Sequence, residues 1–277
     1  MREVQPLTLL TLRFGMGAFL LLLIQLHKNK RFFKDFSYTD WIYILLLAAV
    51  GIAGHSIIQI YGLMYSTAIN TGWIIAIYPI LITITAYLFL EEKISLRKIV
   101  GIILGFLGVS LVISKGEFSL SLFRLTSTYG DFLVLISGVT WTAFTVGGRG
   151  FLSRFPPLVA ITPIMTIGFL ILLPFSGLEG GWKNLFHISL SAWIGILYLG
   201  IFCSFLAYLF WYSALEKMDS STIGMYLYLE PFVTLIGAYL FLDEEIQWIT
   251  LIGGGITLLG VYLTTWKNLD KNSNKNS

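Results

Sequence analysis

The sequence predicts an all-α integral membrane protein with nine transmembrane helices. Hydrophobic residues make up 56% of the 277 residues and charged residues only 12%, about half of the charged share that a soluble domain carries. The mean hydropathy is +0.81. A bilayer core of about 30 Å needs roughly 20 apolar residues in one helix. Nine apolar runs have a suitable length: 6–26, 41–63, 68–90, 97–114, 129–150, 157–176, 192–215, 220–242 and 248–266.

The composition also argues against several other classes of protein. The formal net charge is only +3, which is small for a nucleic-acid surface, where many cations face phosphates. The single cysteine, Cys203, leaves no disulfide framework. The basic cluster near the N-terminus follows the first apolar run instead of preceding it, so we interpret this run as a retained helix and not as a secretory signal. The polar tail 268–277 predicts disorder.

The distribution of Lys and Arg predicts the orientation in the membrane. Thirteen of these residues fall on one side of the predicted helices and four on the other. Because loops rich in Lys and Arg stay on the cytoplasmic side, we expect the C-terminus and the loop after residue 26 to face the cytoplasm. The expected location is a prokaryotic plasma membrane.

The two halves of the chain are related by an internal repeat. The segment 79–94 aligns with 231–246 at an offset of 152, and nine of the sixteen positions are identical. A weaker match relates 6–17 to 157–168 at an offset of 151. The offset of 152 also pairs one tryptophan and two glycines with identical residues: Trp41 with Trp193, Gly101 with Gly253, and Gly108 with Gly260.

The number of helices between equivalent points predicts that the two repeats are inverted. The chain crosses five predicted helices from 6–26 to its equivalent 157–176, and an odd number reverses the direction of crossing. Inverted repeats are typical of secondary transporters. We assign the first repeat to 1–116 and the second to 129–267. The helix 129–150 has no counterpart in the first repeat, so we expect that repeat to lack its first helix, through loss of an N-terminal segment.

Three segments carry a resemblance to a known family. They are PLTLLTLRF at 6–14, P-x12-EKISLRKIVG at 79–101, and LEPF…FLDEEI at 229–246, the last two leading into glycine-rich helices. With these features the chain resembles the EamA-type family of the drug/metabolite transporter superfamily. The resemblance implies ten helices in two inverted five-helix repeats, cytoplasmic termini, and substrates that range over amino acids, amines, nucleobase-like metabolites and drugs. It implies no enzyme activity.

Glu230 is the sharpest candidate for a functional residue. It lies near the middle of the run 220–242, where an ionisable side chain is costly and is usually functional or paired. Pro231 follows it, and proline disturbs the hydrogen-bond ladder of a helix. Tyr78, directly before Pro79, is equivalent to Glu230 by the offset of 152. We expect Glu230 and Tyr78 to line a substrate cavity and the two prolines to act as hinges; the alternative for Glu230 is a structural bond to a neighbouring helix.

Other polar and aromatic residues also fall inside predicted helices. Arg13 lies about two turns into the first helix, where it could attract a substrate carboxylate, pair with Glu230 or bind loop carbonyls. His55 and Gln59 share one helical face, which favours either a cavity or hydrogen bonds between helices. No residue pattern predicts a catalytic, metal or cofactor site. The aromatic candidates for the cavity, with ordinary packing as the alternative, are Trp73, Trp141 and Tyr226.

Two further groups of residues are assigned to structure. Carboxylates between predicted helices satisfy backbone N–H groups at helix starts. Glycines in the runs 97–114 and 248–266 let helix backbones approach closely. The carboxylates are Glu91, Glu92, Asp243, Glu244 and Glu245.

Together these features predict a secondary transporter that exports a small organic metabolite by alternating access. The solute is an amino acid, an amine or a drug-like compound. The other expected partners are the lipid bilayer, protons as a candidate coupling ion, and a second copy in a candidate homodimer; nucleic acid is not expected. The alternatives are a membrane-embedded scaffold, a transport-incompetent paralogue, and a lipid-modifying enzyme. The sequence favours the enzyme least, because no DxxxD, HExxH or GxSxG motif stands at a helix end.

Overall fold

The computed structural model describes residues 3–114, 128–182, 185, 188–233, 236 and 247–273. Every regular element in this part of the chain is helical, and eight helices in it are long and apolar enough to cross a membrane. The predicted all-helical membrane class is therefore confirmed. The eight spans are Pro6–Lys28, Tyr38–Tyr65, Ile69–Leu90, Leu96–Ser114, Tyr129–Leu152, Pro157–Glu179, Leu190–Lys217 and Trp248–Thr265.

The ninth predicted helix, 220–242, lies only partly inside the described residues. It begins with the short helix α11 (Ser220–Gly224) and continues as the 3-10 helix η6 (Met225–Leu229). Helical residues 230–233 follow. Residues 234, 235 and 237–242 lie outside the described part, as do the carboxylates at 243–245.

The predicted helix 68–90 is broken before Pro79. Its first part, α4 (Ala68–Ile75), ends there, and α5 (Tyr78–Leu90) begins with Pro79 in its first turn. Proline has no backbone N–H and its ring clashes with the preceding turn, so a helix starts at this residue more easily than it passes through it. In the other repeat the equivalent departure from the α-helix is the 3-10 helix η6, which ends at Leu229, just before Glu230.

Two spans contain a π-helical segment at equivalent positions. In the first repeat η2 (Ala48–Gly54) joins α2 (Tyr38–Leu47) to α3 (His55–Tyr65). In the second repeat η5 (Leu199–Leu206) joins α9 (Leu190–Tyr198) to α10 (Ala207–Lys217). The first residues of η2 and η5 differ by 151, within one residue of the offset of 152 that relates the same two spans. A π-helical turn often marks a functional position.

The C-terminal helix is longer than predicted. We expected disorder from residue 268, but α13 (Trp248–Ser273) continues as far as Ser273. The segment 261–273 contains no glycine or proline that would end the helix. The described helix thus overlaps the first part of the predicted tail, and disorder of the tail stays a prediction; residues 274–277 lie outside the described part.

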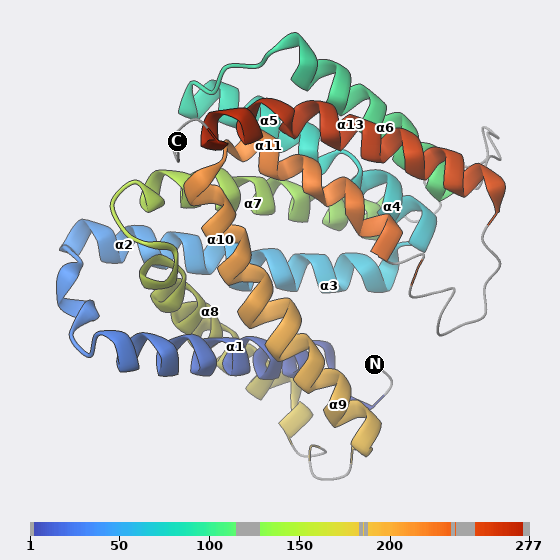
Figure 1. The fold of residues 1–277 in the computed structure, drawn as a ribbon. Coiled ribbons are helices and arrows are strands. Elements are labelled where there is room, and N and C mark those ends of the chain that lie inside the picture. Colours follow the sequence, from blue (N-terminus) through green and yellow to red (C-terminus); the bar gives the residue numbers. More distant parts are fainter. Residues whose placement is uncertain are drawn as a thin grey trace. The chain divides into compact units, whose positions relative to one another are not determined.

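The described helices form two compact units, and each contains segments from both repeats. Unit 1 comprises residues 1–61 and 143–217. In it, α1 (Pro6–Lys28) packs against α8 (Pro157–Glu179) and against η5, while α8 packs against η2 (Figure 1). Since α1 is equivalent to α8 and η2 to η5, the contact of α1 with η5 and that of α8 with η2 are the same contact with the repeats exchanged.

Close approaches in unit 1 follow the same exchange. A Cβ atom added to Gly17 of α1 would lie 3.0 Å from the Cβ of Ser204 in η5. One added to Gly168 of α8 would lie 2.5 Å from the Cβ of Ile52 in η2. Gly17 and Gly168 are repeat equivalents, as are Ile52 and Ser204, so small residues permit the close approach in both places.

Unit 2 comprises residues 62–142 and 218–277, and its largest helix contact joins α6 (Leu96–Ser114) to α13 (Figure 1). A Cβ on Gly101 would lie 2.6 Å from the Gly260 carbonyl oxygen, and one on Gly108 would lie 2.5 Å from that of Gly253. Residue numbers rise along α6 as they fall along α13, so the two helices are antiparallel. Exchanging the repeats turns the first contact into the second, which is the pattern of a two-fold symmetric interface.

The core of unit 2 follows the same symmetry. It contains Val109 and Val261, which are repeat equivalents, and Ala76 and Tyr228, which are equivalents as well. Met225 completes this buried cluster. Equivalent side chains from the two repeats therefore meet in one hydrophobic core.

Candidate functional site

Arg13 of α1 is bound to the π-helical segment η5 in unit 1. Its Nε donates to Ser204 Oγ at 3.0 Å, and its Nη2 donates to the Cys203 carbonyl at 3.3 Å. The guanidinium carbon lies 4.8 Å from the centre of the Phe14 ring, within the range of a cation–π interaction. Of the roles considered for Arg13, bonding to a carbonyl is therefore observed, although this carbonyl belongs to a helix and not to a loop.

The hydrogen-bond pattern of η5 explains why it can accept these bonds. In a π-helix the N–H of each residue reaches a carbonyl five positions back, and the widened turn leaves carbonyls open to a partner outside the helix. The other repeat has no such anchor, because apolar Ile164 and Ile52 stand at the equivalents of Arg13 and Ser204. The two π-helical segments are thus equivalent in backbone and different in chemistry.

His55 and Gln59 belong to unit 1 as well. His55 begins α3 directly after η2 and is buried, while Gln59 lies one turn later and is half-buried. Both therefore lie on one face of α3. Whether this face lines a cavity stays a prediction, as does an ion pair between Arg13 in unit 1 and Glu230 in unit 2.

Tyr78 fixes the start of α5 against α7 (Thr128–Leu152) in unit 2. Its hydroxyl donates to the Val134 carbonyl at 2.8 Å and lies 2.8 Å from Ser137 Oγ. Only 3% of the side chain is exposed, and Gly138 makes room for the ring, because a Cβ there would lie 2.3 Å from Tyr78 Cε1. These contacts give Tyr78 a structural task at the helix break, and a cavity role for it stays a prediction.

The other predicted cavity residues of unit 2 are accessible to differing degrees. Glu230 caps η6 and is exposed, and Tyr226 within η6 is 42% exposed. Trp73 and Trp141 are half-buried, and the Trp73 ring packs edge-on against Phe106 at 6.3 Å. An accessible carboxylate beside a broken helix can bind a cation or take up a proton.

Unit 1 contains a cavity of about 380 Å³ between the start of α1 and helix α9. None of the predicted site residues lines it. No group of three or more His, Cys, Asp or Glu residues within the described ranges has a metal-binding arrangement. The lining residues are Glu3, Val4, Leu9, Ser191, Ala192, Gly195, Ile196 and Leu199.

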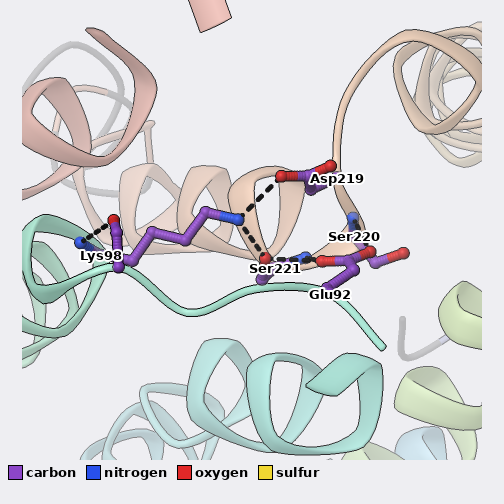
Figure 2. Close-up of polar contacts among 6 residues, drawn as sticks. Glu92, Lys98, Asp219, Ser220 and Ser221 are labelled. Atoms are coloured by element: carbon purple, nitrogen blue, oxygen red, sulfur yellow. Dashed lines mark hydrogen bonds and ion pairs between the residues drawn. The ribbon is translucent and has the colours of Figure 1, made fainter. Parts of the chain in front are cut away.

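A polar cluster that we did not predict joins the start of α11 to the α5–α6 loop and to the first turn of α6 (Figure 2). Lys98 Nζ donates to Asp219 Oδ2 at 2.9 Å and to Ser221 Oγ at 2.7 Å. The Glu92 carboxylate accepts from the backbone N–H groups of Ser220 at 2.7 Å and Ser221 at 3.1 Å, and from the Ser221 hydroxyl at 2.7 Å. We call these five residues the α11 latch.

The structural role predicted for Glu92 is confirmed, with a different partner. It satisfies N–H groups at the start of α11, 128 residues away from Glu92 at Ser220, and not those of the next helix. We did not predict a role for Lys98, because its partner Asp219 is 121 residues away in the sequence. A lysine in the first turn of a helix opposes the helix dipole, and this is the sequence signal that could have pointed to a compensating carboxylate.

Known proteins with similar sequences are named as transporters. The model of the EamA-like transporter family matches residues 1–114 and 128–266. An uncharacterized transporter of Archaeoglobus fulgidus is 32% identical over 96% of this chain and 90% of its own length. A probable terminal-alkyne amino-acid exporter of Streptantibioticus cattleyicolor is 24% identical over 82% of this chain and 74% of its own.

The fold has a solved counterpart as well. A crystal structure matches with a TM-score of 0.76 at 18% identity, covering 96% of this chain and 89% of the other. That likeness supports the arrangement of helices alone. The family match over nearly the whole chain and the eight apolar spans agree with each other. This multi-pass membrane protein belongs to the EamA-like transporter family.

Proposed function

We propose that this protein is a secondary transporter that exports a small organic metabolite by alternating access. The observation that carries the proposal is the interruption of a helix at the same point in both repeats, before Pro79 and before Glu230–Pro231. Irregular backbone at membrane depth is tolerated only where it is buried in protein or lines a water-filled cavity. Discontinuous helices of this kind form the substrate sites of many transporters.

The proposed mechanism exchanges the conformations of two inverted repeats. It is supported by the antiparallel contact of the equivalent helices α6 and α13, and by the exchanged contacts of α1 with η5 and α8 with η2. Two inverted repeats can each adopt the conformation of the other. When they exchange conformations, a central site that was open to one side of the membrane becomes open to the other. The α6–α13 glycines allow the two copies to meet at close range.

The proposed substrate class is an amino acid, an amine or a drug-like cation. Its support is the carboxylate of Glu230 beside Pro231, together with the partly exposed residues Tyr226, Trp73 and Trp141 in the same unit. A carboxylate attracts an ammonium group by charge, and an aromatic face attracts it by a cation–π interaction. A relative named as a probable amino-acid exporter agrees with this class. We propose in addition that Glu230 takes up the coupling proton.

Reconstituted protein in liposomes tests this function. With an inside pool of unlabelled amino acids and amines, the protein should accumulate the labelled solute by counterflow. Glu230→Gln should reduce the initial rate at least about tenfold, because an amide neither holds an ammonium charge nor exchanges a proton at this position. Glu216→Gln is the matched control, since Glu216 is exposed in the last turn of α10, and its rate should equal that of the wild type.

Three results would oppose the proposal. Absence of counterflow for every solute would favour a scaffold or an incompetent paralogue. Chemical conversion of the solute would indicate an enzyme. Unchanged counterflow and pH dependence in Glu230→Gln would remove Glu230 from the mechanism.

The proposed setting is a prokaryotic plasma membrane with the C-terminus in the cytoplasm. Its support is the excess of Lys and Arg on that side of the chain. We propose that the transporter also forms a homodimer, which crosslinking in native membranes would detect as a band of twice the mass.

A further inference from the structure

Resting on the proposed transport function, we propose that the α11 latch locks one side of the transporter. Its ion pair and the Glu92 hydrogen bonds hold the start of α11 against the first turn of α6 and the α5–α6 loop (Figure 2). In this proposal, the contact keeps closed the side of the protein at which α11 and α6 begin. Release of the latch is then a necessary part of opening that side.

The position of α11 depends on contacts outside the helix itself. A helix of five residues is far below the length at which a helix is stable alone, because nucleation costs more than so few hydrogen bonds return. Its first two N–H groups, those of Ser220 and Ser221, are both bound by the Glu92 carboxylate. Loss of this carboxylate contact frees the start of α11 first.

Lys98 is mostly buried and binds two residues of the latch. Its side chain is 10% exposed against 45% for Asp219, and it donates to Asp219 and to the Ser221 hydroxyl that in turn donates to Glu92. The four side chains thus form one connected chain of charges and hydroxyl groups. Removing the Asp219 charge leaves the mostly buried Lys98 ammonium without its charged partner, and this weakens the connected network.

The latch is directly continuous with the proposed substrate site. The chain passes from Ser221 in α11 through η6 to Glu230, which caps η6. No loop separates the latch from Glu230, so a shift of α11 also shifts the Glu230 carboxylate. The lock therefore acts on the element that carries the candidate binding residue.

The residues equivalent to the Lys98–Asp219 ion pair are uncharged in the opposite repeat. By the offset of 152, the equivalents of Lys98 and Asp219 are Thr250 and Thr67, neither of which carries a charge. In the described part of the chain, Thr67 instead caps its own helix by accepting from the Asn70 N–H at 3.1 Å. Residues flanking Thr67 are held by hydrogen bonds to Asp131, since Ser66 Oγ and Asn70 Nδ2 both donate to its carboxylate. The two ends of the exchange are thus held by different chemistry, and in this proposal the Lys98–Asp219 ion pair biases the resting state toward closure of the α11 side.

Cysteine accessibility tests this bias without a substrate. In a Cys203→Ser background, which removes the single native cysteine, Tyr226→Cys reports on access to η6. A membrane-impermeant maleimide is supplied from the side at which Lys217→Cys is labelled. Lys98→Met should raise the labelling rate at Tyr226→Cys by about fivefold or more, the range of coupling between conformational states. Asp219→Asn should do the same, and the double variant should add nothing further.

The matched control is Arg97→Met, which removes a cation from the neighbouring exposed position in the same helix turn. It should leave the labelling rate unchanged. Should Lys98→Met fail to fold, Asp219→Asn carries the test, since Asp219 is partly exposed and tolerates the amide. An unchanged rate in the folded latch variants, or an equal rise in Arg97→Met, would overturn the lock.

Measuring both labelling and counterflow on the same protein preparations distinguishes failure of the lock from failure of the transport proposal. Counterflow in the wild type with no change of labelling in the latch variants would refute the lock and leave the transporter in place. A change of labelling without counterflow of any solute would refute the transporter and leave the α11 latch as a conformational lock.

Discussion

The close contact between α6 and α13 predicts that replacing a glycine by alanine changes the stability by different amounts at different positions. Gly108→Ala places a Cβ 2.5 Å from the Gly253 carbonyl oxygen and 2.5 Å from the Thr257 nitrogen, both of them backbone atoms. To reach an ordinary contact of 3.4 Å, the helices must separate by about 0.9 Å at this point. Helix backbones cannot yield as a side chain does, so the change should destabilise the protein.

The magnitude follows from two opposing effects. Overpacking a close contact costs about 1–3 kcal/mol, while alanine favours a helix over glycine by about 1 kcal/mol. The net loss for Gly108→Ala is therefore up to about 2 kcal/mol. Gly255→Ala in α13 is the matched control, because no atom lies within 4 Å of a Cβ at that position. It should gain up to about 1 kcal/mol through propensity alone.

The assay is unfolding of the purified protein in mixed detergent micelles, with Gly101→Ala, Gly253→Ala and Gly260→Ala beside the other two variants. Partners in one contact, such as Gly108 and Gly253, should be non-additive, whereas Gly101 and Gly253 belong to different contacts and should be closer to additive. Equal effects of Gly108→Ala and Gly255→Ala would refute the close antiparallel packing.

Two further predictions concern unit 1. Arg13→Gln should destabilise the protein by about 1.5–3 kcal/mol, the range for charged hydrogen bonds, and Ser204→Ala by about 1 kcal/mol. Thermal unfolding in detergent measures both changes. Unchanged stability of Arg13→Gln would contradict the binding of Arg13 to η5. The backbone N–H of Ser189, followed by its hydroxyl, lowers the pKa of Glu3 below the ordinary 4.5, so this contact is complete above pH 4.5 and is lost as the pH falls through the lowered pKa. Hydrogen exchange at the Ser189 amide, corrected for intrinsic rate, should therefore accelerate in acid in the wild type, whereas in Glu3→Gln it should already be fast and independent of this titration.

Most of the helix arrangement could be predicted because the membrane imposes it. Apolar length alone locates the spans, since every backbone polar group in lipid must be bonded inside a helix. The break before Pro79 was harder to foresee, because proline is compatible with either a kink or a new helix start. The π-helical segments leave no trace in the pattern, because the residues of η2 and η5 are as apolar as those of an ordinary membrane helix.

The site could be predicted only where chemistry is visible in a single residue. Glu230 and Arg13 stand out because a charge inside an apolar run needs a reason. One partner of Arg13 is the backbone carbonyl of Cys203. Every residue type has such a carbonyl, so the sequence does not show which one accepts the bond. The latch joins Lys98 to a residue 121 positions away, and no local pattern encodes a contact of that kind.

The central claim is that the two repeats cross the membrane in opposite directions, and sidedness of equivalent cysteines tests it most directly. Leu96 and Trp248 are repeat equivalents at the starts of α6 and α13, and they are 75% and 82% exposed. In the Cys203→Ser background we expect an impermeant maleimide to label Leu96→Cys from the side of the C-terminus and Trp248→Cys from the other side. Labelling of both cysteines from one side would contradict the inverted arrangement and, with it, the proposed mechanism of alternating access.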